Sequence, residues 1–130
     1  MSDLREAAAT GGGLYPAIWL DMLRLREGME AKLTPGRLAD AGSDWPEQVA
    51  EMFAGMMTPE ALHAIAKRTP RTAADDRLCE ADVYVAEWDL AHARRDAARA
   101  GFRQAVGECP PGFGETFIAR EELARAETAP

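Results

Sequence analysis

The chain has 130 residues, of which 47% are hydrophobic and 28% are charged, and its formal net charge is −7. This balance is typical of one globular domain with a buried core, and it excludes an intrinsically disordered chain. The negative sign argues against nucleic acid as a partner, because nucleic acids are bound by clustered Lys and Arg. Here the arginines alternate with acids, as in Arg94, Arg95 and Asp96, and we interpret them as a solvated face.

Location is predicted from what the sequence lacks. No apolar run approaches the ~20 residues of a membrane span. The first six residues have neither the basic start nor the apolar core of a secretory signal. As written, the sequence therefore predicts a cytoplasmic protein, and a periplasmic or envelope location is the alternative if a leader has been removed.

The composition favours an all-α fold. Alanine, leucine, arginine and glutamate dominate, and all four favour helix, whereas the β-branched runs expected of strands are absent. Residues 1–13 are predicted to form a flexible arm or a short helix, because three glycines at its end separate it from the rest. Residues 14–127 are predicted to form a single helical domain.

The first half of that domain contains three predicted helices and one irregular stretch. Residues 14–27 are apolar on most sides and Gly28 ends them, which predicts a helix packed on several sides. Residues 29–44 form at most a weak helix, which Pro35-Gly36 interrupts. A helix to about Met57 follows, with Asp44 as cap, Pro46 in the first turn, and an apolar stripe of Val49, Met52, Phe53 and Met56. Thr58-Pro59-Glu60 then starts a helix whose predicted buried face is Ala61, Leu62, Ile65 and Ala66.

The helix predicted over residues 72–94 is the most informative one, because it carries two apolar stripes. A surface helix has one such stripe, so two stripes predict a helix between two neighbours, with its acids separating the stripes. The first stripe is Leu78, Ala81, Tyr84, Val85, Trp88 and Ala91; the second is Cys79, Val83, Ala86 and Leu90; the acids are Glu80, Asp82, Glu87 and Asp89.

Two more helices complete the predicted domain. Asp96 is predicted to cap a helix over residues 96–106, which buries Ala98, Phe102 and Ala105 and carries small residues where another helix can approach, Gly101 among them. The run from Cys109 to Gly112 ends that helix. A last helix is predicted over residues 113–126, with Phe117, Ile118, Leu123 and Ala124 as its contacts.

The stretch from Cys79 to Pro110 resembles a tetratricopeptide repeat, a helix–turn–helix of about 34 residues with small and aromatic residues at fixed spacings before a proline. Ala98, Phe102, Ala105 and Pro110 reproduce the second half of that pattern, whereas Asp82 and Asp89 stand where the family has aromatic residues. Residues 14–125 further resemble the C-terminal half of the NlpI-like bacterial tetratricopeptide lipoproteins. The features that match, in order, are residues 14–20, Trp45-Pro46, residues 57–60, Cys79-Glu80-Ala81, Ala98, Phe102, Ala105-Val106 and residues 121–124.

This resemblance implies a superhelix of about six helices in stacked antiparallel hairpins, and a non-catalytic adaptor or scaffold that binds another protein or peptide. Stacked hairpins present a concave face lined by their first helices. The resemblance assigns that groove to Glu80, Val83, Glu87, Leu90 and Ala91. Such a groove is acidic, so a basic or amphipathic segment is the predicted guest. A structural homo-oligomerisation domain without a peptide ligand, such as a homodimer, is the alternative function.

No catalytic, cofactor or metal site is predicted. His63, His92, Cys79 and Cys109 could together make a zinc site, but none of them is paired at the short spacing that structural zinc sites use. A nucleophile needs a base and an orienting group, and nothing local supports either cysteine in that role. The chain is therefore predicted not to be an enzyme.

The two cysteines are predicted to be neighbours in space. In an antiparallel hairpin the start of the first helix and the end of the second lie at the same end, and Cys79 and Cys109 occupy those two places. A disulfide and a pair of buried thiols both stay open, because packed helix axes are 8–10 Å apart and a bond needs Cα atoms within about 7 Å.

Overall fold

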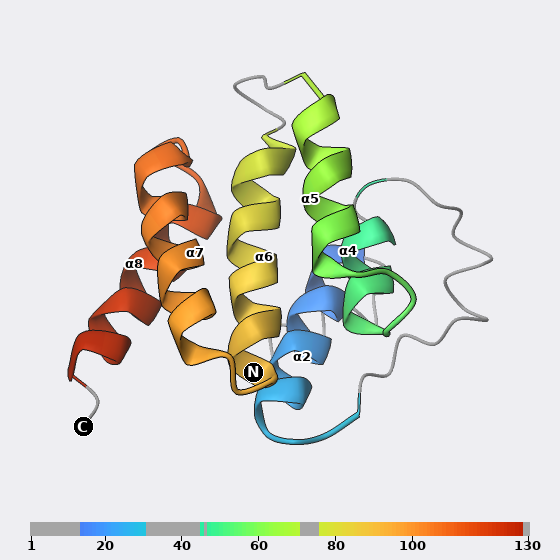
Figure 1. Cartoon of the computed structure of the whole chain (residues 1–130), viewed down its shortest axis with the longest axis horizontal. Coiled ribbons are helices and arrows are strands. Elements are labelled where there is room, and N and C mark those ends of the chain that lie inside the picture. The colour runs from blue at the N-terminus through green and yellow to red at the C-terminus, as the bar shows by residue number, and fades with distance from the viewer. Residues whose placement is uncertain (1–13, 31–44, 46, 71–75, 129–130) are drawn as a thin grey trace. The chain divides into compact units, whose positions relative to one another are not determined.

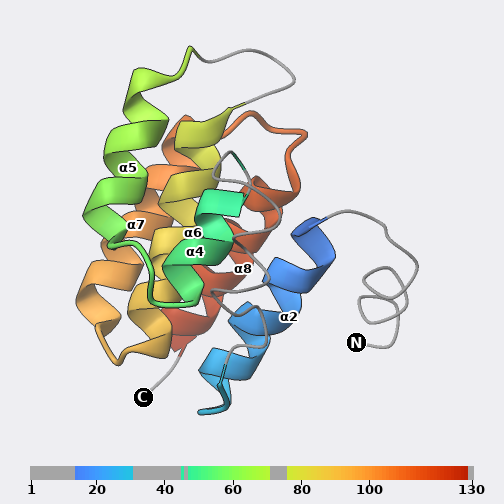
Figure 2. The same cartoon turned by 90° about the vertical axis from the view of Figure 1, so that its right-hand side faces the viewer.

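The computed structural model describes residues 14–30, 45, 47–70 and 76–128. Over these residues the chain forms six helices joined by turns, and no strand occurs in them (Figures 1 and 2). This confirms the predicted all-helical class. The predicted N-terminal arm, the cap Asp44 and the first-turn Pro46 lie outside the described residues, as does most of the predicted weak helix.

The chain divides into two compact units, Met1–Leu62 and His63–Pro130. In the first unit, α2 (Leu14–Arg26) contacts α4 (Glu47–Phe53). Helix α5 (Pro59–Arg68) crosses the boundary between the units. The second unit holds α6 (Arg77–Ala91), α7 (Arg95–Glu108) and α8 (Gly114–Thr128). A single domain over residues 14–127 stays a prediction.

Glycines with positive φ follow α2 and α4, the two helices that lie wholly within the described part of the first unit. Gly28, at φ 78°, follows α2 as predicted, and the amide of Met29 donates to the carbonyl of Arg24 over 2.8 Å. Helix α4 ends earlier than predicted, at Phe53, because the chain turns at Gly55 with φ 84°. Val49, Met52 and Phe53 are buried, but the assignment of Met56 to the same apolar stripe is wrong: Met56 follows the turn and is 46% exposed.

The predicted start of α5 is confirmed. The Thr58 hydroxyl oxygen accepts a hydrogen bond from the amide of Ala61 over 3.1 Å, which is the geometry of an N-cap. Leu62 and Ala66 are buried and Ile65 is half-buried, whereas Ala61 is exposed and does not belong to the buried face.

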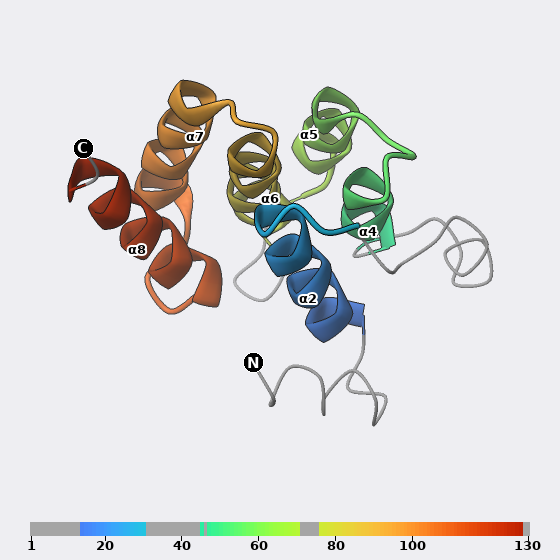
Figure 3. The same cartoon turned by 90° about the horizontal axis from the view of Figure 1, so that it is seen from below.

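Helices α6 and α7 pack side by side as the predicted hairpin (Figure 3). Ala98, Phe102 and Ala105 are buried in it at 1%, 2% and 0% exposure, so the alanine–phenylalanine–alanine spacing does mark the face that α7 turns inward. The core that they share with the other two helices consists of Cys79, Val83, Ala86, Ala98, Phe102, Ala105, Cys109 and Ala119.

The small residue at position 101 sets how closely the two helices approach. A Cβ atom added to Gly101 would lie 3.0 Å from the Cβ atom of Ala86 and 3.6 Å from the carbonyl oxygen of Asp82. No larger side chain fits there without a shift of one helix, which confirms the prediction that another helix comes close at this position.

The ends of the hairpin helices differ slightly from the prediction. The carboxylate of Asp76 caps α6 by accepting from the amide of Cys79 over 3.0 Å. Arg94, not Asp96, occupies the N-cap position of α7, and Asp96 lies in the first turn, where an acid favours the helix dipole. Between the helices Ala93 adopts φ 61°, and the amide of Arg94 donates to the carbonyl of Asp89 over 2.8 Å.

Helix α8 packs mainly on α7 and also reaches α6 (Figure 1). Ile118 and Leu123 pack against the core as predicted, but Phe117 is 67% exposed and Ala124 is exposed, so those two predicted contacts are wrong. The buried residues of α8 are instead Thr116, Ala119 and Glu122, which follow one another at intervals of three and so lie near one face of the helix.

Candidate functional site

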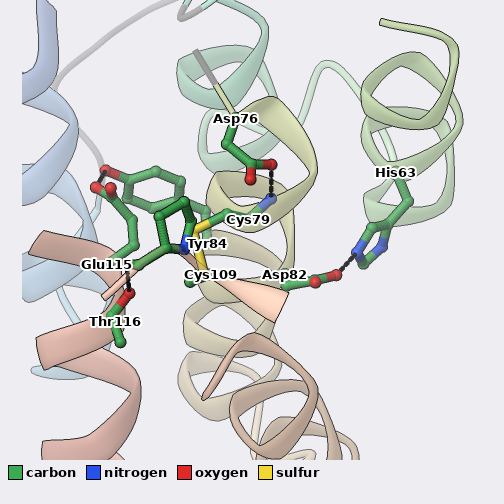
Figure 4. The surroundings of a disulfide bond; sticks show 9 residues. His63, Asp76, Cys79, Asp82, Tyr84, Cys109, Glu115 and Thr116 are labelled. Atoms are coloured by element: carbon green, nitrogen blue, oxygen red, sulfur yellow. Dashed lines mark hydrogen bonds and ion pairs between the residues drawn. A yellow bond between two sulfur atoms is a disulfide. The ribbon is translucent and has the colours of Figure 1, made fainter. Parts of the chain in front are cut away.

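A disulfide between Cys79 and Cys109 ties the start of α6 to the end of α7 (Figure 4). The Cα atoms lie 4.9 Å apart, and both residues are buried. The predicted proximity of the two cysteines is confirmed. Of the two alternatives that the sequence leaves open, a disulfide or a pair of thiols, the structure has the disulfide.

Two further contacts lie near the disulfide and connect α6 and the end of α7 to α8. The hydroxyl of Thr116 donates to the carbonyl of Pro110 over 2.6 Å, which holds the start of α8 against the residue that follows Cys109. The phenol of Tyr84 donates to Oε2 of Glu115 over 3.4 Å (Figure 4). Burial raises the pKa of the Glu115 carboxyl above its ordinary value, against the lowering effects of a backbone hydrogen bond and of Tyr84. The starts of α6 and α8 and the end of α7 are therefore fastened together at one end of the hairpin.

The opposite end of the hairpin, at the turn from α6 to α7, is held by an aromatic and charged cluster. The rings of Trp88 and His92 stack with centroids 3.9 Å apart, and Nδ1 of His92 donates to the carbonyl of Trp88 over 2.7 Å. The guanidinium of Arg94 lies 5.9 Å from the centre of the Trp88 ring and 3.4 Å from a carboxylate oxygen of Asp89. This cluster covers the turn, so both ends of the hairpin are stabilised by side chains.

A histidine–aspartate pair joins α5 to α6. Nε2 of His63 lies 2.8 Å from Oδ1 of Asp82, and the side chains are 28% and 3% exposed respectively (Figure 4). An aspartate can orient a histidine for base catalysis, but a nucleophile must then lie within hydrogen-bond reach of the ring. Among the described hydrogen bonds neither side chain makes another one, so this pair acts as a structural tie.

The four residues that were considered for zinc are engaged elsewhere. The cysteines are bonded to each other, His63 meets Asp82, and His92 stacks on Trp88. In the part of the chain that the structure describes, no group of three or more His, Cys, Asp or Glu side chains is placed to hold a metal ion.

The predicted groove residues do not form one open surface. Val83 belongs to the hairpin core, Glu80 and Glu87 are 7% and 1% exposed, and Leu90 packs partly buried against the same core; Ala91 is half-buried. Glu80 and Glu87 therefore do not present their carboxylates on an open acidic surface. Replacing both by lysine is expected to destabilise the chain, because two buried positions would change charge.

Comparison with known proteins found no family model, no curated protein and no solved structure that matches this chain. None of the helices in the described residues is both long and apolar enough to cross a membrane.

Proposed function

We propose that the chain is a protein-interaction module that binds a segment of another protein on the outer surface of its helical hairpins, as its resemblance to tetratricopeptide repeats implies. The single observation that carries this proposal is an exposed aromatic side chain beside a complete core. The core shared by α6, α7 and α8 is packed around Phe102, whereas the ring of Phe117 on α8 is 67% exposed to solvent.

A fixed surface of this kind suits binding rather than catalysis. The hairpin is fastened at one end by the Cys79–Cys109 bond and at the other by Arg94, the N-cap residue of α7, which contacts Trp88 and Asp89 of α6, so its outer faces are ordered before a partner arrives. Preorganisation lowers the entropic cost of association, and aromatic side chains are enriched among the residues that dominate binding energy.

The exposed ring of Phe117 also fits the alternative function, self-association, because a second copy of the chain would cover it equally well. The two functions differ in what the isolated protein does. A binding module stays monomeric until it meets its ligand, whereas an oligomerisation domain is a stable dimer at all working concentrations.

Selection from a random peptide library against the immobilised, disulfide-intact protein tests the proposal, together with light scattering after size-exclusion chromatography. We expect a monomer that enriches one family of related peptides, with weaker binding to Phe117→Ala than to the native chain. A concentration-independent dimer that enriches no peptide family would replace the proposal by the oligomerisation function. A monomer that enriches none would refute both.

A further inference from the structure

The acids and the bases of the His63–Pro130 unit are distributed differently between core and surface. Among the residues that the structure describes in this unit, six acids are buried, and four of them belong to α6. All six interact with another group, and for four of them that group is the amide of Cys79, the ring of His63, or the guanidinium group of Arg94 or Arg125. The buried acids are Asp76, Glu80, Asp82, Glu87, Asp89 and Glu122.

Helix α7 shows the opposite pattern, because none of its three arginines is buried as a whole residue. Arg95 and Arg103 are exposed and Arg99 is half-buried, and none of the three makes an ion pair with any residue that the structure describes. They are four residues apart, so they follow one side of the helix as a row about 12 Å long. We call Arg95, Arg99 and Arg103 the arginine row.

Few acids of α7 are available to neutralise the arginine row. The helix contains two acids, and Glu108 accepts a hydrogen bond from Gln104 over 3.4 Å. The other, Asp96, lies in the first turn and is exposed. In a chain with a net charge of −7, the three arginines of α7 thus outnumber the two acids of that helix. Screening in physiological salt acts over about 8 Å, so a partner at this surface responds mainly to the charges in front of it.

We propose that the arginine row is a docking surface for an acidic segment of a partner protein, whose carboxylates pair with the three guanidinium groups. This inference rests on the proposed function and names the partner's chemistry: Asp- or Glu-rich, in contrast to the basic guest that the sequence alone suggests. Arginine suits the task because its planar group binds a carboxylate through two parallel hydrogen bonds. A protein segment is favoured over nucleic acid because three arginines pair with a short run of carboxylates, whereas nucleic-acid sites use larger clusters of Lys and Arg that follow the phosphate backbone.

The variant Arg95→Gln/Arg103→Gln removes two charges from the row and leaves the half-buried Arg99 in place. Lys67→Gln/Arg68→Gln removes two exposed charges from the end of α5 and is the matched control. Peptides selected against the native protein are expected to be enriched in Asp and Glu. Their affinity, measured by fluorescence anisotropy, should fall about tenfold for the row variant, the upper range for two exposed charge pairs, and less than twofold for the control. The loss should shrink as salt is raised.

Three results would overturn the inference. If the selected peptides are not acidic, the proposed function stands and the docking surface is wrong. If acidic peptides bind both variants equally well, the row is not their site. If a single-stranded oligonucleotide of the same charge binds the native protein more tightly than the acidic peptides, with the same dependence on Arg95 and Arg103, the partner is a nucleic acid. Circular dichroism spectra and melting temperatures equal to those of the native protein establish that both variants are folded.

Discussion

Phe102→Ala is the substitution to which the packing of the hairpin is most sensitive. The ring is 2% exposed and lies in a core whose other members are mostly small, namely alanines and the disulfide. Removing it loses about 2–3 kcal/mol of hydrophobic transfer energy. The fully buried neighbours are mostly alanines and can fill the space only in part, so a cavity cost of about 1–2 kcal/mol is added. We therefore expect the free energy of unfolding to fall by about 3–5 kcal/mol.

Phe117→Ala is the matched control, because it makes the same chemical change at a ring that is 67% exposed. We expect it to cost less than about 1 kcal/mol. Urea unfolding, followed by far-ultraviolet circular dichroism without reductant, measures both variants on the same scale. Equal losses for the two substitutions, or a loss below about 1 kcal/mol for Phe102→Ala, would refute the packing of α7 against α6.

Three more predictions concern the hairpin and its closed end. Gly107→Ala is expected to raise the free energy of unfolding by up to about 1 kcal/mol through helix propensity, because nothing lies within 4 Å of the added Cβ. Gly101→Ala should gain nothing or lose stability, because its Cβ would lie 3.0 Å from the Cβ of Ala86 on α6. Equal gains of the two variants in urea unfolding would contradict the close approach of the helices. Replacing both Cys79 and Cys109 by serine is expected to cost about 3.5 kcal/mol in the chain-entropy model, since the bond spans 30 residues; an unchanged urea midpoint would show that the bond does not constrain the unfolded chain. Burial raises the pKa of Glu115 above its unfolded value, so the folded state binds the proton more tightly and stability from this group is lost as pH rises through the folded pKa. Glu115→Gln should therefore gain stability relative to the native chain between pH 4 and pH 7, and a difference that does not vary with pH would exclude this burial effect.

Much of the helical hairpin could be predicted from local spacing. Ala98, Phe102 and Ala105 recur at intervals of four and three, which place them on one face of a helix, and the structure buries all three. Gly28 and Thr58 were recognisable for a similar reason, since helix ends depend on the conformation and side chain of one or two residues. The proximity of the cysteines followed from the geometry of any antiparallel hairpin.

The acids of α6 could not be placed in this way. Sequence periodicity assigns charged residues to solvent, because they are rarely buried without a partner. Asp82 is buried because His63, 19 residues earlier, supplies that partner, and Asp89 because the turn brings Arg94 back to it. Such pairings depend on where the chain returns in space, and no local pattern contains that information.

To predict the exposure of Phe117 and of the arginine row, one must know which faces of α8 and α7 pack against the neighbouring helices. Aromatic residues are usually buried, so the sequence favours Phe117 as a contact. In α8, however, Ala119 faces the core, and Phe117, two positions earlier on the helix, points to a different side and is exposed. The sequence does show arginines four residues apart in the row, but the negative net charge of the whole chain favours the prediction of a basic partner and not of an acidic one.

The central claim, that the hairpin's outer surface binds a protein segment, is tested most directly by nuclear magnetic resonance. The native protein, labelled with ¹⁵N, is titrated with the strongest peptide from the library selection. We expect saturable shifts of amide signals at exposed positions of the hairpin unit, around Phe117 of α8 and around Arg95 and Arg103 of α7, with the core signals of Phe102 and Ala105 nearly unchanged. No saturable shift anywhere on α7 or α8 would contradict the central claim.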